Sequence, residues 1–123
     1  MRVVVTGAFG FIGSHFVKYI FNLDDSIKIL VIDNLTYAAN KDNLKGVTYE
    51  HLHKDICNVT ANDLGEYDYL VNFAAESHVD NSIKDGKPFV RTNVEGTFNL
   101  LEVARQNPNL KKFIQISTDE VYG

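Results

Sequence analysis

The stretch MRVVVTGAFGFIG, residues 1–13, decides the fold. Its valines at 3–5 are typical of a short buried strand, and they lead into three glycines spaced three apart. Gly7 can make a tight turn after the strand, Gly10 lets the backbone approach a pyrophosphate, and Gly13 lets the following helix pack closely on the strand. The N-terminus of that helix presents free N–H groups to an anion. The pattern predicts a βαβ unit that binds a dinucleotide.

A carboxylate further along the chain strengthens this interpretation. A second apolar run, residues 27–32, ends in Asp33, which lies 20 positions after Gly13. At the carboxyl end of the neighbouring strand, a carboxylate can accept hydrogen bonds from both ribose hydroxyls of adenosine, and it repels a 2′-phosphate. The sequence therefore predicts NAD rather than NADP as the cofactor. The alternative is a glycine turn that joins strand to helix and binds nothing.

The composition is that of one soluble domain with a real core. The chain has 123 residues, 45% hydrophobic and 23% charged, with a formal net charge of −4. Because the basic residues are scattered, we expect neither nucleic acid nor an anionic membrane surface as a partner. No apolar run approaches the ~20 residues of a membrane span and no signal peptide precedes the first strand, so we expect a cytoplasmic protein. No cluster has metal-ligand spacing, so no metal is expected.

Apolar runs that alternate with helical periodicity predict a doubly wound, Rossmann-like α/β fold with a parallel sheet of about five strands. Strands are expected near residues 2–6, 27–32, 47–52, 67–75 and 112–117, helices near 11–21 and 89–106, and at most a turn of helix at 60–64. Right-handed crossovers favour the strand order 3-2-1-4-5. The ligand should then lie across the carboxyl ends of the strands, where the order reverses.

The helix expected at 89–106 has a broad apolar arc. Such an arc exceeds the ~100° stripe that a sheet alone covers. One face is expected to contain Val90, Val94, Leu101 and Ala104, with Phe89, Phe98, Leu100 and Val103 on its flanks.

Five blocks of sequence carry a family resemblance. They are TGAFGFIG at 6–13, DNLTYA at 33–38, AAESHVD at 74–80, TNVEGT at 92–97 and STDEVYG at 117–123. Together they resemble the extended short-chain dehydrogenase/reductases, and within these most closely the dTDP-glucose 4,6-dehydratases. The resemblance covers essentially the whole chain. It implies that residues 1–123 form an NAD-binding domain of Rossmann type, without the C-terminal substrate domain.

The resemblance also implies roles for individual residues. Ser77 and Thr118 would lie near the sugar of a nucleoside-diphosphate sugar substrate. The implied cofactor-binding residues are Gly7, Gly10, Phe11, Ile12 and Gly13 at the pyrophosphate, Asp33, Asn34, Leu35 and Thr36 around the adenosine ribose, Asp55 and Ile56 beside the adenine, and Phe73, Ala74, Ala75, Glu76, Ser77 and Thr92 on the path to the nicotinamide.

The implied reaction is the NAD-dependent dehydration of dTDP-glucose to the 4-keto-6-deoxy sugar, with Thr118, Asp119 and Glu120 as catalytic residues. Asp119 would protonate the departing C6 hydroxyl, and Glu120 would remove the C5 proton. Adjacent carboxyl groups suit an elimination, because one proton is given and another taken within a few ångströms. Without the resemblance, Asp-Glu after a strand is more often a solvated loop or a helix start. The alternatives are a related 4-epimerase or decarboxylase, and a nucleotide-binding module without chemistry.

Three features depart from the family pattern. Ala8 and Phe9 stand where the family more often has small residues, a difference that we expect to be harmless. The other two departures bear on activity. Asn81 stands where many members have arginine, which leaves the sugar nucleotide open. The Tyr-x-x-x-Lys pair that starts oxidation at C4 would follow Gly123. Tyr37 and Lys41 have the same spacing, but they lie in the loop after the second strand, so we do not expect them to be catalytic. Residues 1–123 alone are therefore expected to be inactive, and the resemblance implies a homodimer through the 89–106 helix.

Overall fold

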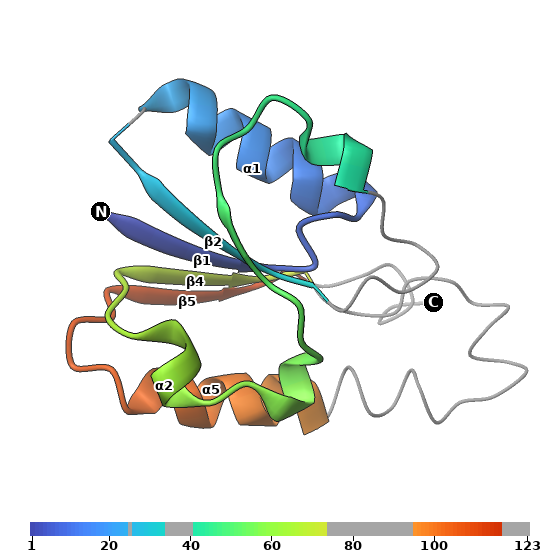
Figure 1. Cartoon of the computed structure of the whole chain (residues 1–123). Helices are drawn as coiled ribbons and strands as arrows, with labels where there is room; N and C mark the ends of the chain where they lie inside the picture. The colour runs from blue at the N-terminus through green and yellow to red at the C-terminus, as the bar shows by residue number, and fades with distance from the viewer. Residues whose placement is uncertain (25, 34–40, 74–94, 117–123) are drawn as a thin grey trace, which may run out of the picture.

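The computed structural model describes residues 1–24, 26–33, 41–73 and 95–116 (Figure 1). They form a parallel sheet of five strands in the order β3-β2-β1-β4-β5, which confirms the predicted fold class and strand order. The strands are β1 (Arg2–Thr6), β2 (Lys28–Ile32), β3 (Glu50–Leu52), β4 (Tyr69–Asn72) and β5 (Lys112–Gln115). The α-helices are α1 (Phe11–Leu23), α2 (Ala61–Leu64) and α5 (Thr97–Arg105). The short 3-10 helices are η1 (Lys41–Leu44) and η2 (Ile56–Asn58).

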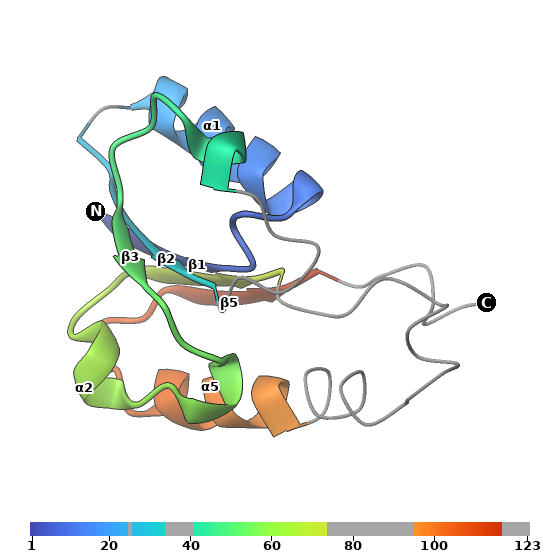
Figure 2. The same cartoon turned by 45° about the vertical axis from the view of Figure 1, so that its right-hand side comes forward.

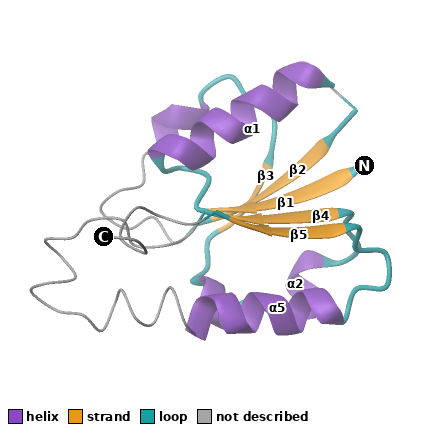
Figure 3. Ribbon diagram, turned by 180° about the vertical axis from the view of Figure 1, so that it is seen from behind, coloured by secondary structure: helices purple, strands orange, loops and turns teal. Residues whose placement is uncertain are grey.

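The molecule has three layers, with α1 and η1 on one face of the sheet and α2 and α5 on the other (Figures 1 and 3). Both faces of the central strands are apolar, because helices cover both. Alternate residues of each strand enter the two cores. Val3, Val5, Ile29, Val31 and Val71 lie on the α1 side, and Val4, Leu30, Ile32 and Leu70 lie on the α5 side.

Four of the expected strands are shorter in the structure, the third and fourth most of all. The run at 47–52 pairs with β2 only at Glu50–Leu52, while Val47 and Tyr49 pack against the core beside α1. The fourth strand is Tyr69–Asn72. The residues at 74–75, 89–94 and 117, expected in strand or helix, lie outside the described residues. Within the described ranges, no helix has the length and apolarity needed to cross a membrane.

The structure divides the apolar arc of α5 between a buried and an exposed face. Leu100, Val103 and Ala104 are buried, whereas the Leu101 side chain is 48% exposed. The broad apolar arc expected on this helix is therefore only partly exposed, because the chain itself buries Leu100 and Val103, while Val90 and Val94 lie outside the described residues. The reason is packing: Leu100 and Val103 occupy the core formed by β1, β2 and β4, which fixes the rotation of the helix.

Neighbouring leucines on α5 give a matched test of this rotation. Leu100→Ala leaves a cavity in the core, so we expect it to lower the free energy of unfolding by about 2–5 kcal/mol. Leu101→Ala should change it by about 0.5 kcal/mol, because the side chain is half-exposed. Urea denaturation monitored by circular dichroism measures both. Equal losses would contradict the burial of Leu100 and the exposure of Leu101 on this helix.

Candidate functional site

The glycine loop between β1 and α1 has the geometry that the sequence predicts. Gly7 has a φ of 65°, in the left-handed region that favours glycine, and its N–H donates to the Ile32 carbonyl at 2.8 Å. This bond ties the loop to the end of β2. Among the described residues, no side chain caps the N-terminus of α1 at Gly10. The first N–H groups of the helix are therefore suited to bind an anion.

Gly13 lets the helix approach the turn after β1 closely. A Cβ at this position would overlap the Gly7 carbonyl oxygen and press on the Ala8 backbone. Since backbone cannot move aside as a flexible side chain can, only glycine fits there. The close approach that the spacing predicts at Gly13 is thus present.

Asp33 directly follows β2. The carboxyl ends of β1 and β2 lie at the same edge of the sheet (Figure 2). Asp33 is only 8% exposed. Its Oδ2 accepts a hydrogen bond from the Phe9 N–H at 3.1 Å. The glycine loop therefore fixes the orientation of the carboxylate expected to bind the ribose.

Phe9 has a structural role at this site that the sequence analysis did not indicate. Its side chain is fully buried. Its ring makes T-shaped contacts with the rings of His51 and Tyr49, whose centroids lie 4.8 Å and 5.8 Å from its own. His51 also places Nε2 at 3.3 Å from the Asp33 carbonyl oxygen. Phe9 thus joins the glycine loop to the segment around β3. A large apolar residue between two glycines was the signal that could have indicated it.

The η2 turn follows β3, where Asp55 and Ile56 were expected beside the adenine. Asp55 caps the turn, with Oδ1 accepting from the Cys57 N–H at 2.9 Å, and Ile56 is buried. Lys54 is anchored to Asp63 of α2 through a 2.7 Å ion pair. Hydrogen bonds from Lys54 and from the Thr60 backbone hold the pKa of the Asp63 carboxyl below its ordinary value. The Asp55 side chain therefore stabilises the turn itself, and Lys54 connects the residues just before the turn to α2.

A polar network lies at the carboxyl ends of β1, β4 and β5. The Thr6 hydroxyl donates to the Asn72 side-chain oxygen and accepts from the Phe73 N–H at 3.1 Å. The Asn72 amide donates to Gln115 Oε1 at 2.7 Å. Thr6 and Asn72 are buried, and the sequence analysis singled out neither. Their bonds hold together the strand ends from which the expected nicotinamide path begins at Phe73.

The structure brings part of the predicted site together. Gly7, Gly10, Gly13, Asp33, Asp55, Ile56 and Phe73 lie at the carboxyl edge of the sheet, as does the start of α1 at Phe11 and Ile12. Other predicted residues lie outside the described ones: Asn34, Leu35, Thr36, Ala74, Ala75, Glu76, Ser77, Thr92, Thr118, Asp119 and Glu120. Tyr37 is also outside them. No group of three or more His, Cys, Asp or Glu residues in the described part could hold a metal ion.

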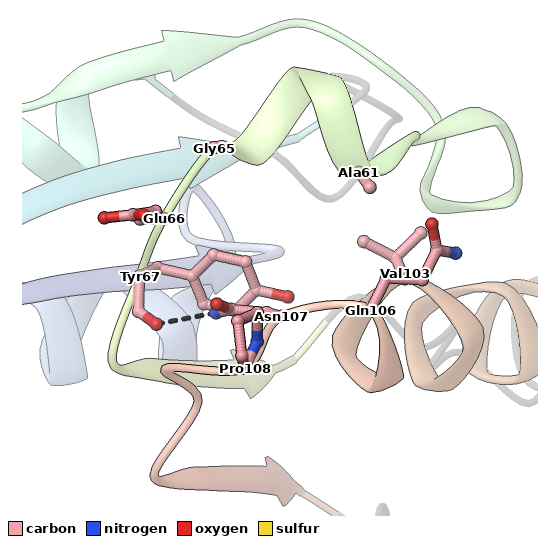
Figure 4. A pocket seen from close by; sticks show the side chains of 8 residues that line it. All are labelled: Ala61, Gly65, Glu66, Tyr67, Val103, Gln106, Asn107 and Pro108. Atoms are coloured by element: carbon pink, nitrogen blue, oxygen red, sulfur yellow. Dashed lines mark hydrogen bonds between the residues drawn. The ribbon is translucent and has the colours of Figure 1, made fainter.

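A pocket of about 230 Å³ lies at the opposite, amino-terminal edge of β4 and β5 (Figure 4). There the Asn107 amide donates to the Tyr67 carbonyl at 2.7 Å. Burial raises the pKa of the Tyr67 phenol, an effect that the nearby Asn107 amide partly offsets. The Tyr67 hydroxyl is inaccessible to solvent and has no hydrogen-bond partner among the described residues. This pocket is not part of the carboxyl-edge site.

Comparisons with known proteins agree with this geometry. The profile of the NAD dependent epimerase/dehydratase family matches residues 3–123. The low-salt glycan biosynthesis protein Agl12 of Haloferax volcanii is 49% identical over 130 residues, covering 100% of this chain and 41% of the relative. A probable dTDP-glucose 4,6-dehydratase of Sinorhizobium fredii is 46% identical over 139 residues, covering 100% of this chain and 39% of the relative.

A solved structure extends the comparison to three dimensions. The crystal structure of DesIV, a dTDP-glucose 4,6-dehydratase from Streptomyces venezuelae, was determined with NAD and TYD bound. It superposes with a TM-score of 0.89 at 42% identity, covering 100% of this chain and 41% of DesIV. The chain thus spans about two fifths of the length of the proteins it matches.

Proposed function

Because the chain belongs to the NAD dependent epimerase/dehydratase family, we propose that its carboxyl edge holds NAD in a protein that dehydrates a nucleoside-diphosphate sugar. One observation carries the proposal furthest. The Phe9 N–H of the glycine loop orients the buried Asp33 carboxylate. One hydrogen bond therefore connects the predicted pyrophosphate site, at the glycine loop, to the predicted ribose site, at Asp33. Similarity to dehydratases named for dTDP-glucose supports that sugar nucleotide as the substrate.

The described residues fit NAD. The first turn of α1 offers uncapped N–H groups to the pyrophosphate, and Gly10 places no side chain in its way. Asp33 can accept the ribose hydroxyl hydrogens and disfavours a 2′-phosphate by charge. The η2 turn, with Asp55 and Ile56, would flank the adenine. Phe73, at the end of β4, would begin the path to the nicotinamide.

The proposed reaction couples oxidation to elimination. Bound NAD supplies a hydride acceptor for C4 of the sugar and later a hydride donor for C6. Glu120 would take the C5 proton, which becomes acidic once C4 is a ketone, and would return it to C5 when the hydride adds to C6. Asp119 would give a proton to the departing C6 hydroxyl, which leaves as water. Thr118 and Ser77 would orient the sugar through their hydroxyl groups. A 4-epimerase needs no such pair of carboxyl groups, and the Asp-Glu sequence therefore favours the dehydratase.

Asp33 provides the test of the cofactor proposal. Asp33→Ala should weaken NAD binding about 10-fold to 100-fold, since it removes charge-assisted hydrogen bonds to the ribose, and it should relax discrimination against NADP. Asp33→Asn is the matched control for shape, because an amide oxygen can still accept the Phe9 N–H. We expect it to weaken NAD binding less than alanine does. Calorimetric titration with NAD and NADP measures these changes. Equal affinities of the unaltered chain for both cofactors would refute the role of Asp33.

The chain of residues 1–123 should bind NAD and yet form no 4-keto-6-deoxy sugar from dTDP-glucose. The resemblance implies a Tyr-x-x-x-Lys base at C4, and losing such a base costs roughly 10²–10⁴ in rate. Mass spectrometry of the sugar nucleotide would detect product, with a complete dTDP-glucose 4,6-dehydratase as the positive control. If product did form, Tyr37→Phe and Tyr122→Phe would identify the unsuspected base, and the proposal of inactivity would be wrong.

We further propose that the outer face of α5 meets a second copy of the chain. Phe98 and Leu101 are 66% and 48% exposed there, whereas Leu100 and Val103 are buried within the monomer and do not contribute. Burying Phe98 and Leu101 against a second copy would remove apolar surface from water.

The double variant Phe98→Ser, Leu101→Ser should lower the average molar mass measured by light scattering at high protein concentration. The matched control is Tyr19→Ser, Leu23→Ser on α1, whose side chains are 65% and 64% exposed. We expect it to leave the molar mass unchanged. A strictly monomeric unaltered chain at high concentration would count against this surface.

A further inference from the structure

The η2 turn is built onto α5 more than onto the sheet. The buried Ile56 side chain packs against the start of the helix so closely that a Cβ at Gly96 would overlap it. Ile56 and Val59 also share a core cluster with Leu100 of α5. The position of the turn therefore depends on the position of the helix.

Asn99 of α5 makes the polar connection between these two elements. Its Nδ2 donates to the Ile56 carbonyl at 2.7 Å and to the Val59 carbonyl at 2.9 Å. Both acceptors are carbonyl oxygens, so only the amide nitrogen, with its two hydrogens, can face them. A single side chain thus spans the turn and donates a hydrogen bond to a carbonyl at each of its ends.

We propose that Asn99 is a positioning residue for the adenine end of the cofactor site. It does not touch the cofactor. By holding the Ile56 and Val59 carbonyls, it fixes the backbone that carries Asp55 and Ile56 at the carboxyl edge of the sheet. Without these bonds the turn is free to move in the unbound protein. Binding must then order the turn, and the free-energy cost of this ordering lowers the affinity for the cofactor. This inference rests on the proposed function, since it assumes that the turn flanks adenine.

The chain offers a matched control for the experiment. Asn107 also donates its side-chain amide to a backbone carbonyl, that of Tyr67 at 2.7 Å, but at the opposite edge of the sheet. Replacement of either asparagine removes the same kind of hydrogen bond. A loss of stability alone would therefore affect both variants, whereas a loss of ligand affinity should follow only from Asn99.

Calorimetric titration of AMP, ADP-ribose and NAD tests the proposal. We expect Asn99→Ala to weaken all three about 3-fold to 10-fold by a common factor, since adenosine is the part they share. Asn99→Asp should weaken them more, because a carboxylate repels the two carbonyls. Asn107→Ala and Asn107→Asp should leave all three affinities unchanged. Urea denaturation measures the stability of each variant separately.

The outcomes separate this inference from the proposed function. An unaltered chain that binds none of the three ligands would overturn the proposed function. Normal affinity in the Asn99 variants, or an equal loss in the Asn107 variants, would overturn only the role of Asn99. Should the variants fail to fold, NMR of the unaltered chain decides: on addition of AMP, the side-chain amide signals of Asn99 should shift and those of Asn107 should not. Unmoved Asn99 signals in the presence of bound AMP would refute the proposal.

Discussion

The absence of a side chain at Gly13 allows α1 to approach the turn after β1 closely enough to build the rest of the site. A Cβ there would overlap the Gly7 carbonyl oxygen, and Gly7 itself needs a φ of 65° to turn the chain. With the helix seated, the Gly7 N–H reaches the Ile32 carbonyl and the Phe9 N–H reaches Asp33. One steric constraint therefore brings the uncapped helix N-terminus and the acidic end of β2 to the same edge.

The carboxyl edge is held by contacts between elements that are distant in sequence. Thr6 and Asn72 join the ends of β1 and β4, and the bond from Asn72 to Gln115 adds β5. His51 connects β3 to both Phe9 and the Asp33 carbonyl. Such bonds are strong when buried and fully satisfied. They fix the end of each strand, which is where a ligand of a doubly wound sheet binds.

The rotation of helix α5 on the sheet decides which of its residues contact the core, which contact the η2 turn and which remain exposed to solvent. Leu100 and Val103 fill the core, Asn99 and Gly96 face the η2 turn, and Phe98 and Leu101 point to solvent. The same rotation thus determines which residues support the proposed adenine site and which remain for a second chain. Periodicity alone identified an apolar helix but left its rotation open, because several rotations satisfy so broad an apolar arc.

The sequence by itself determined the strand order, the glycine turn, the position of Asp33 and the cofactor class. These depend on local properties, namely glycine spacing, apolar periods and the charge that follows a strand. Only the tertiary structure decided the extent of β3, the buried face of α5, and the roles of Phe9, His51, Asn72 and Asn99. Each of these depends on a partner far along the chain, such as Asp33 for Phe9 or Ile56 for Asn99. A hydrogen bond or ring contact of this kind forms only when folding brings two segments together, and no local pattern in either segment encodes it.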